Sequence, residues 1–189
     1  ADLVVVNNLR EFEASLVILN GEIAAREGRY LAGIRGSPPE AAERRTMNMP
    51  PVKPEQVEIR YEGDEARVRV IGVIEDQIYT ESLIHTLSVE GGVVKPDVEN
   101  DVLKVCVFER HRGSGRIGRG FVKGFGLKSG AIASTVAHDS HNLIAVGVED
   151  GDICKAANRL RELNGGLIVV EGGEVKAELP LPVAGLMST

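Results

Sequence analysis

The chain has 189 residues, a hydrophobic share of 43%, a charged share of 26% and a formal net charge of -6. This length and composition allow one or two globular cores, whereas no apolar run reaches the length of about 18 residues that a membrane-spanning helix needs. The negative charge argues against nucleic acid as a partner, since binding a phosphate backbone requires clustered cations.

Both ends of the sequence lack the signals of a complete protein. It opens with Ala1-Asp2-Leu3-Val4-Val5-Val6, without an initiator methionine or the basic region of a signal peptide. It closes on Gly185-Leu186-Met187-Ser188-Thr189 without a helix stop signal. We therefore expect a piece of a longer protein.

The cysteine content points to a reducing compartment. Two cysteines, Cys106 and Cys154, are too few for a disulfide framework, and Cys106 lies in an apolar run that is typical of a protein core. We expect a cytoplasmic protein with no membrane partner.

The first 32 residues are predicted to form a small β structure. Residues 16–19 and 22–25 are apolar runs on either side of Asn20-Gly21, a pair that favours a hairpin because both positions tolerate positive φ. Prolines and glycines then interrupt residues 33–50. We interpret these residues as a linker between two domains, 1–32 and 51–189.

Beyond the linker the pattern predicts mainly strands. Residues 57–61 and 66–70 alternate apolar and polar side chains, which predicts a half-buried antiparallel hairpin. The pattern of residues 78–89 is ambiguous. Further strands are predicted at residues 102–108, 131–136, 143–148, 167–170 and 174–179.

One helix is predicted at about residues 152–164. Apolar residues recur there at helical spacing, Asp150 or Asp152 can cap the N-terminus, and Gly165 supplies a stop. The chain is therefore expected to be a strand-rich α+β protein, with mostly antiparallel sheets, one clear helix and a short N-terminal β piece.

A glycine-rich stretch covers residues 113–126. Its first six residues fit G-x-G-x-x-G after a strand, but the helical pattern that a dinucleotide-binding fingerprint requires does not follow. We predict a mobile loop whose glycines allow close approach of a partner or ligand. The cations between Arg110 and Lys128 form either an anion site or a solvated loop, and we favour the solvated loop.

The densest polar cluster is Ala137-His138-Asp139-Ser140-His141-Asn142, between two predicted strands. His138 and His141 are three residues apart, so both imidazoles can act on one metal or one substrate. Asp139 can orient an imidazole or accept a hydrogen bond from a purine N–H. The alternative is a turn in which Asp139, Ser140 and Asn142 bind local backbone groups. We favour a functional cluster, because a simple turn needs fewer polar residues.

The two remaining histidines are isolated. His85 and His111 have no neighbour at metal-ligand spacing, and we interpret both as structural or surface residues. Residues 109–112, Glu-Arg-His-Arg, follow a predicted strand and are at most the rim of a site.

Three segments resemble the C-terminal domain of bacterial and archaeal adenine deaminases. They are residues 109–111 (ERH), 120–142 (GFVKGFGLKSGAIASTVAHDSHN) and 179–188 (LPLPVAGLMS). Residues 1–6 and 17–21 are similar to the closing strands of the small β-domain of amidohydrolases. The resemblance covers nearly the whole chain, and its central motif is long and specific.

The resemblance implies hydrolytic removal of the 6-amino group of adenine, which gives hypoxanthine and ammonia. In that family a (β/α)8 barrel holds two metal ions, manganese or iron, which generate the attacking hydroxide. The barrel carries a His-x-His pair that this sequence lacks. We therefore expect no metal ligand in this chain and no activity from the chain alone.

The resemblance also implies roles for individual residues. We expect catalytic roles for His138, Asp139 and His141, and substrate binding by Ser140, Asn142, Phe125 and Gly126. The expected partners are adenine, the barrel domain of the same protein and a second copy in a homo-oligomer. Two alternatives are a stand-alone purine-binding module without catalysis and a purely structural or dimerisation domain.

Overall fold

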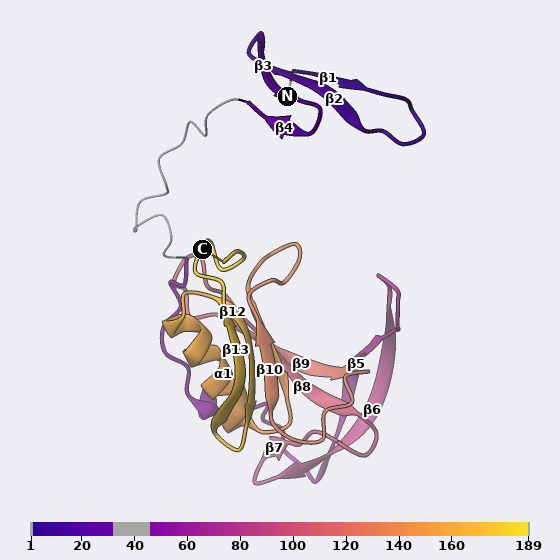
Figure 1. Ribbon diagram of the computed structural model, residues 1–189. Helices are drawn as coiled ribbons and strands as arrows, with labels where there is room; N and C mark the ends of the chain where they lie inside the picture. The colour runs from indigo at the N-terminus through magenta and orange to yellow at the C-terminus, as the bar shows by residue number, and fades with distance from the viewer. Residues whose placement is uncertain (1, 32–45, 189) are drawn as a thin grey trace. The chain divides into compact units, whose positions relative to one another are not determined.

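The chain divides into two compact units, Ala1–Pro38 and Pro39–Thr189. The computed structural model describes residues 2–31 and 46–188 (Figure 1). Within the predicted linker, residues 33–45 lie outside the described residues. Met49, also placed in that linker, is only 4% exposed and packs into the core of the larger unit. The larger unit therefore includes residues that precede position 51.

The small unit is a four-stranded antiparallel sheet in the order β1-β2-β3-β4. Its strands are β1 (Leu3–Val6), β2 (Ala14–Leu19), β3 (Glu22–Arg26) and β4 (Arg29–Tyr30). Asn20 and Gly21 both have positive φ at the turn between β2 and β3, which confirms the predicted hairpin. Among residues 2–31, Ala24 is the one buried apolar side chain.

The larger unit contains a nine-stranded sheet in the order β13-β12-β10-β11-β8-β9-β5-β6-β7. Neighbouring strands are antiparallel except β5 and β9, which run parallel. The strands are β5 (Glu65–Val73), β6 (Thr80–Glu90), β7 (Val93–Val94), β8 (Val102–Phe108), β9 (Ile117–Lys123), β10 (Ala131–Ser134), β11 (Leu143–Gly147), β12 (Gly166–Glu171) and β13 (Glu174–Pro180).

One α-helix occurs in the described part of the chain. This helix, α1 (Asp150–Glu162), packs across β10, β11 and β12 (Figure 1). A short 3-10 helix, η1 (Pro54–Gln56), precedes the sheet. Neither helix is long and apolar enough to cross a membrane. The expected strand-rich α+β architecture with one clear helix is confirmed.

The main core lies between α1 and the sheet. Ile153 and Leu160 of the helix are fully buried there together with Phe108 of β8. The two cysteines belong to the same core, and burial raises the pKa of the Cys106 and Cys154 thiols to about 12. Both thiols are therefore small core residues, as the sequence predicts for Cys106.

The N-terminus of α1 differs from the expectation that Asp150 or Asp152 caps it. The N-cap position is Glu149, and no side chain caps it. Asp152 instead accepts hydrogen bonds from the N–H groups of residues 172–173, in the turn between β12 and β13. Asp150 forms an ion pair with Lys104 of β8. These carboxylates join the helix to the sheet, which explains why they are unavailable as caps.

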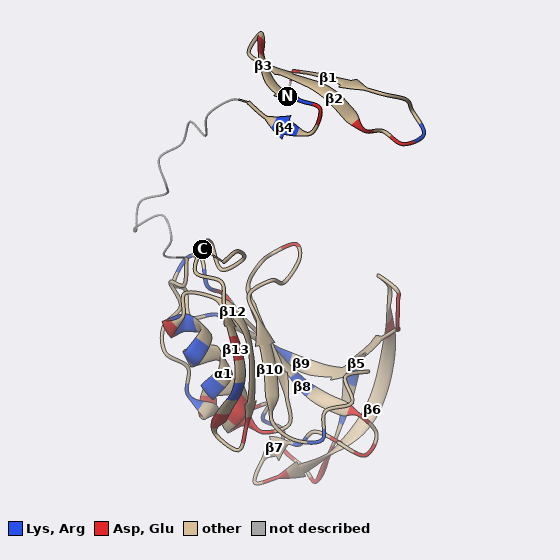
Figure 2. Ribbon diagram, viewed as in Figure 1, with Lys and Arg blue, Asp and Glu red and all other residues tan. Residues whose placement is uncertain are grey.

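The C-terminus of α1 ends near the predicted stop. Asn164 adopts a positive φ of 63°, and the Gly165 N–H donates back to the Leu160 carbonyl at 2.8 Å. This pattern of a left-handed residue followed by a long backward bond is a Schellman motif. The outer face of the helix is charged (Figure 2), and Arg159 pairs there with Glu178 at 2.8 Å.

The predicted hairpin of residues 57–61 and 66–70 is wrong. β5 pairs along its whole length with β6, whereas Arg60 forms only an isolated bridge with Val93. An alternating pattern shows that a segment has one buried face, but it does not specify the partner strand. The long strand β6, ambiguous in the sequence, is the actual partner.

The prediction of a mobile loop over residues 113–126 is also wrong for its central part. Residues 117–123 form β9, which is bonded to β8 on one side and to β5 on the other. Phe121 and Val122 are buried on opposite faces of the sheet. Pairing on both edges and burial on both faces override the poor strand propensity of the glycines. A strand at this place excludes the dinucleotide-binding interpretation.

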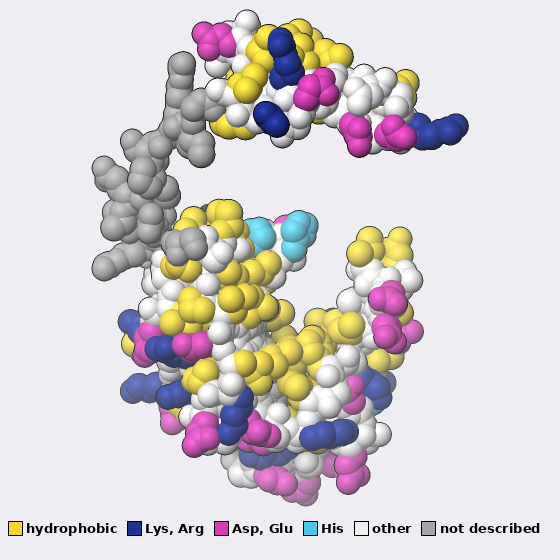
Figure 3. All heavy atoms as spheres, in the orientation of Figure 1, with side chains coloured by type: hydrophobic (Ala, Val, Ile, Leu, Met, Phe, Trp, Pro, Cys, Tyr) yellow, Lys and Arg dark blue, Asp and Glu magenta, His cyan; other side chains and the backbone are white. Residues whose placement is uncertain are grey.

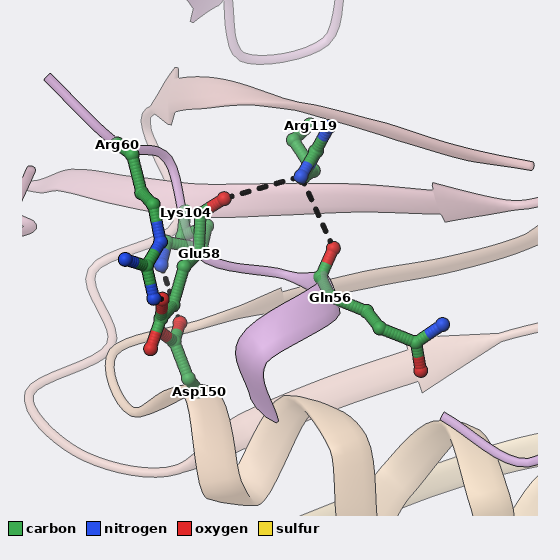
Figure 4. Close-up of polar contacts among 6 residues, drawn as sticks. All are labelled: Gln56, Glu58, Arg60, Lys104, Arg119 and Asp150. Carbon is green, nitrogen blue, oxygen red and sulfur yellow. Dashed lines mark hydrogen bonds and ion pairs between the residues drawn. The ribbon is translucent and has the colours of Figure 1, made fainter. Parts of the chain in front are cut away.

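Charged side chains tie η1 and α1 to the sheet (Figure 4). Lys104 of β8 is 1% exposed and forms an ion pair with Asp150, whose side chain keeps 23% exposure. Arg119 of β9 donates to the backbone oxygens of Gln56 and Glu58 at 3.3 and 3.2 Å. The buried Lys104 ammonium requires a partner such as Asp150, because the free energy of removing an unpaired charge from water is several kcal/mol.

The sheet face opposite α1 is also apolar. In β10 and β12, Ala133 and Ile168 join the core beneath the helix, so their neighbours Ile132 and Leu167 point to the other face. We call this second surface the open face. It contains a hollow of about 340 Å³ whose lining includes Phe125, Ile132, Ile144, Val146, Leu167 and Val169. Figure 3 shows apolar side chains gathered along this hollowed side of the larger unit.

Candidate functional site

The polar cluster of residues 137–142 lies in the loop between β10 and β11. We call this segment the HDSH loop. It extends beyond the ends of the two strands (Figure 1), and histidine side chains stand at its tip (Figure 3). The loop closes on itself through a hydrogen bond of 2.6 Å from the His141 N–H to the Ala137 carbonyl. The structure therefore brings the predicted catalytic residues together in one short segment.

His138 and Asp139 form the exposed part of the loop. Their side chains are 84% and 85% exposed and are paired with each other through His138 Nδ1 and an Asp139 carboxylate oxygen. The His138 ring also lies edge-to-face with His141, with 6.1 Å between the ring centroids. An imidazole held by a carboxylate and open to solvent has the composition of a proton-transfer pair.

His141 and Asn142 form the inner part of the loop. His141 Nδ1 and Asn142 Oδ1 are buried atoms with no hydrogen-bond partner among the described residues. An unpaired buried polar atom costs about 1–3 kcal/mol, so native structures rarely retain one without a purpose. These two atoms therefore lack the partners that buried polar atoms usually have.

Ser140 has the structural role that the alternative interpretation gives it. Its hydroxyl accepts a hydrogen bond from the Asn142 N–H at 3.3 Å, as in a local turn. Asp139 and Asn142 do not behave in this way, since Asp139 pairs with His138 and Asn142 Oδ1 is unpaired. Only one of the three proposed turn residues thus serves the turn.

Side chains at the end of β8 contact the backbone of the HDSH loop. Arg110 Nε donates to the His141 carbonyl at 2.5 Å, and His111 Nε2 lies 3.0 Å from the Ser140 carbonyl. The preceding residue, Glu109, shapes the connecting turn by accepting hydrogen bonds from the backbone N–H groups of His111, Arg112 and Ser114. The Arg112 N–H and the Ser114 hydroxyl hold the pKa of Glu109 at about 2, well below its ordinary value of 4.5.

Sequence reasoning placed Arg110 and His111 at the rim of a site or on the surface. The signal in the sequence is the position of Glu-Arg-His directly after the strand predicted at residues 102–108. The burial of Arg110 was not visible, because it depends on segments that are remote in sequence.

The structure does not place Phe125 and Gly126 with the HDSH loop. Phe125 lines the hollow of the open face, which includes none of residues 137–142. Gly126 donates its N–H to Asp101 at 2.7 Å, in the loop that follows β9. The motif of residues 120–142 is continuous in the sequence, but in the structure some of its residues lie in the HDSH loop and Phe125 lies at the open face.

A second hollow lies beside the loop. It has a volume of about 370 Å³ and is lined by Glu109, His111, Arg112, Ser114, Arg116 and Asn142. Two residues of the basic stretch, Arg112 and Arg116, therefore lie close to Asn142. The residues that line the hollow are all polar or charged, and they include both donors and acceptors next to the inner part of the loop.

The histidines do not assemble into a metal centre within the described residues. Across residues 2–31 and 46–188, no three His, Cys, Asp or Glu side chains gather closely enough to hold a metal ion.

Comparison with known proteins identifies relatives of the chain. The family model described as adenine deaminase C-terminal domain matches residues 77–189. Adenine deaminase of Methanothermobacter thermautotrophicus is 50% identical over 188 residues, which cover all of this chain and 34% of that protein. Adenine deaminase 2 of Carboxydothermus hydrogenoformans is 46% identical over 189 residues, which cover 100% of this chain and 32% of that protein. The chain spans about a third of the length of these relatives.

Proposed function

Since the chain belongs to the adenine deaminase C-terminal domain family, we propose that it is part of an enzyme that converts adenine and water to hypoxanthine and ammonia. The observation that carries this proposal within the structure is the HDSH loop. It combines an exposed His138–Asp139 pair with two buried, unpaired atoms, His141 Nδ1 and Asn142 Oδ1. We infer that the loop faces the reaction site of the full-length enzyme.

The polar atoms of the loop match the edges of a purine. Asn142 Oδ1 can only accept, so it fits an N–H of the adenine amino group or of its five-membered ring. His141 Nδ1 donates or accepts according to its tautomer, and it therefore fits either a ring nitrogen or an N–H. We propose that His138, with Asp139 as its partner, exchanges protons with solvent and substrate.

The manganese or iron centre implied by the family does not fit the described residues of this chain, which do not gather three ligands. We propose that this centre lies in the remaining part of the full-length enzyme, where it would activate water for the hydrolysis. The role of this chain is then to bind the purine and to move protons. We expect the chain alone not to release ammonia from adenine.

The test is substitution of the loop histidines in the full-length enzyme. His138→Ala and His141→Ala should each lower kcat/KM by about 10²–10⁴-fold, the usual loss for a positioned acid–base group. His85→Ala is the matched control, because His85 lies in β6 outside the loop. Steady-state rates and the thermal midpoint are measured on the same variants.

Comparing the steady-state rate with the thermal midpoint decides whether the cluster acts in the reaction or only forms a turn. A reduced rate with an unchanged midpoint supports the proposal, most directly for His138, since exposed polar positions usually change stability by less than about 0.5 kcal/mol. A normal rate with a lowered midpoint would assign the cluster to the turn alone and sink the proposal.

A further inference from the structure

Arg110 joins three segments that are far apart in sequence. Its side chain is buried, with 1% exposure. Nε donates to the His141 carbonyl at 2.5 Å, one Nη donates to the Thr46 carbonyl and hydroxyl at 3.1 and 2.7 Å, and the other Nη donates to the Ala184 carbonyl at 2.9 Å. The guanidinium thus binds the HDSH loop, the segment that precedes η1 and the segment that follows β13.

The acceptors of Arg110 are backbone carbonyls, one hydroxyl and the Met47 sulfur, and none of these partners is a carboxylate. A buried cation bound in this way is stable only if its donors are all satisfied, because no opposite charge compensates its loss of water. The planar fork of arginine fixes the directions of the bonds. Arg110 therefore sets where the His141 backbone lies relative to β8.

His111 makes a second contact with the HDSH loop, at Ser140, the residue before His141. Its Nε2 lies 3.0 Å from the Ser140 carbonyl. A carbonyl can only accept, so this ring nitrogen must carry the proton. Two consecutive side chains, Arg110 and His111, thus hold two consecutive carbonyls, those of His141 and Ser140. Holding both carbonyls orients the peptide units from which the His141 and Asn142 side chains extend.

We propose that Arg110 and His111 are positioning residues for the HDSH loop. They hold the Ser140 and His141 carbonyls so that His141 Nδ1 and Asn142 Oδ1 keep the orientation that binds the purine. This inference rests on the proposed function, and it assigns to Arg110 and His111 an effect that passes through the loop side chains.

The first experiment is a double-mutant cycle on the full-length enzyme. His111→Phe keeps a ring but removes the donor, and we expect kcat/KM for adenine to fall about 10-fold, the equivalent of one hydrogen bond. His111→Gln retains an N–H donor and should recover most of this loss. In a background that carries His141→Ala and Asn142→Ala, His111→Phe should have almost no further effect.

The second experiment perturbs Arg110. Arg110→Lys keeps the charge but loses the fork, and a misplaced loop should lower kcat/KM about 100-fold. Because a buried arginine can be needed for folding, Gly185→Ala provides a gentler change. A Cβ at Gly185 would lie 2.9 Å from an Arg110 Nη, whereas a Cβ at Gly172 would meet nothing within 4 Å. Both glycines have positive φ, so Gly172→Ala controls for backbone strain. We expect only Gly185→Ala to reduce kcat/KM.

The outcomes separate the two proposals. If His141→Ala and Asn142→Ala leave kcat/KM unchanged, the proposed function of the loop fails. If those variants lower the rate while His111→Phe has no effect, or has the same effect in both backgrounds, the positioning role is overturned and the proposed function stands. An equal loss for Gly185→Ala and Gly172→Ala would likewise overturn the role of Arg110.

Discussion

At the scale of single residues, Glu109 makes the free energy of unfolding depend on pH. Its pKa is held at about 2 by the Arg112 N–H and the Ser114 hydroxyl, against an ordinary value of 4.5. Above about pH 4.5 the carboxylate is ionised in both the folded and the unfolded chain, so its stabilising effect is fully present. Between about pH 4.5 and pH 2 the unfolded chain takes up a proton that the folded chain does not. The stabilising effect is therefore lost as the pH falls through this window.

We predict that Glu109→Gln lowers the free energy of unfolding by a constant amount above about pH 4.5. The difference from the unsubstituted chain should shrink toward zero as the pH approaches 2. Urea unfolding at a series of pH values measures it, with Glu81→Gln at an exposed position of β6 as the control. A difference that stayed constant down to pH 2 would show that the ionisation of Glu109 is not coupled to folding.

At the scale of secondary-structure elements, the Lys104–Asp150 ion pair joins β8 to α1. We predict that Asp150→Asn lowers the free energy of unfolding by about 2 kcal/mol, because it leaves the Lys104 ammonium buried without a counter-ion. This is less than the loss for a fully buried pair, since the Asp150 side chain keeps 23% exposure. Urea unfolding measures the loss.

Substitution of Lys104, the other member of this ion pair, provides the control. Lys104→Met removes the buried charge and keeps an apolar chain of similar length, so we expect a smaller loss than for Asp150→Asn. In the Lys104→Met background, Asp150→Asn should cost almost nothing. Equal losses for Asp150→Asn in both backgrounds would show that the two side chains do not act as a pair.

The elements themselves were partly predictable from the sequence. Strands β8, β10 and β11 and the helix α1 each follow from an apolar pattern that is local and strong. The partner of β5 and the strand β9 did not follow, because strand pairing depends on residues that are remote in sequence.

The candidate site was predictable in composition but not in arrangement. The HDSH loop appears in the sequence as a dense polar cluster, so its residues could be named. The sequence could not show which of these residues are buried, because the burial of His141 Nδ1 and Asn142 Oδ1 depends on how the loop packs in the fold. The separation of Phe125 from the loop also required the sheet topology.

At the scale of the whole molecule, the open face sets an expectation about the full-length enzyme. Strands that are apolar on both faces are typical of sheets covered on both sides, yet at β12 the face opposite α1 leaves Leu167 and Val169 each 41% exposed in the described part of the chain. Extended apolar surface on a protein commonly marks an interface. We therefore expect another part of the full-length protein to cover the open face.

We predict that Leu167→Lys combined with Val169→Lys has different effects in the two contexts. Both side chains are 41% exposed in this chain, so its thermal midpoint should change little. In the full-length enzyme the same pair should lower the midpoint, because two charges would be buried. Val175→Lys in β13 is the control. Equal shifts in both contexts would show that the open face stays uncovered.

The three-way contact of Arg110 also has a consequence for the order of events during synthesis. The chain leaves the ribosome from its N-terminus, and Ala184 lies 74 residues after Arg110. Strand β8, which ends two residues before Arg110, can therefore pair before the guanidinium has all its acceptors. The HDSH loop would then reach its final shape only after the segment around Ala184 has emerged and docked. A nascent enzyme would acquire its strands early and its purine-binding geometry late.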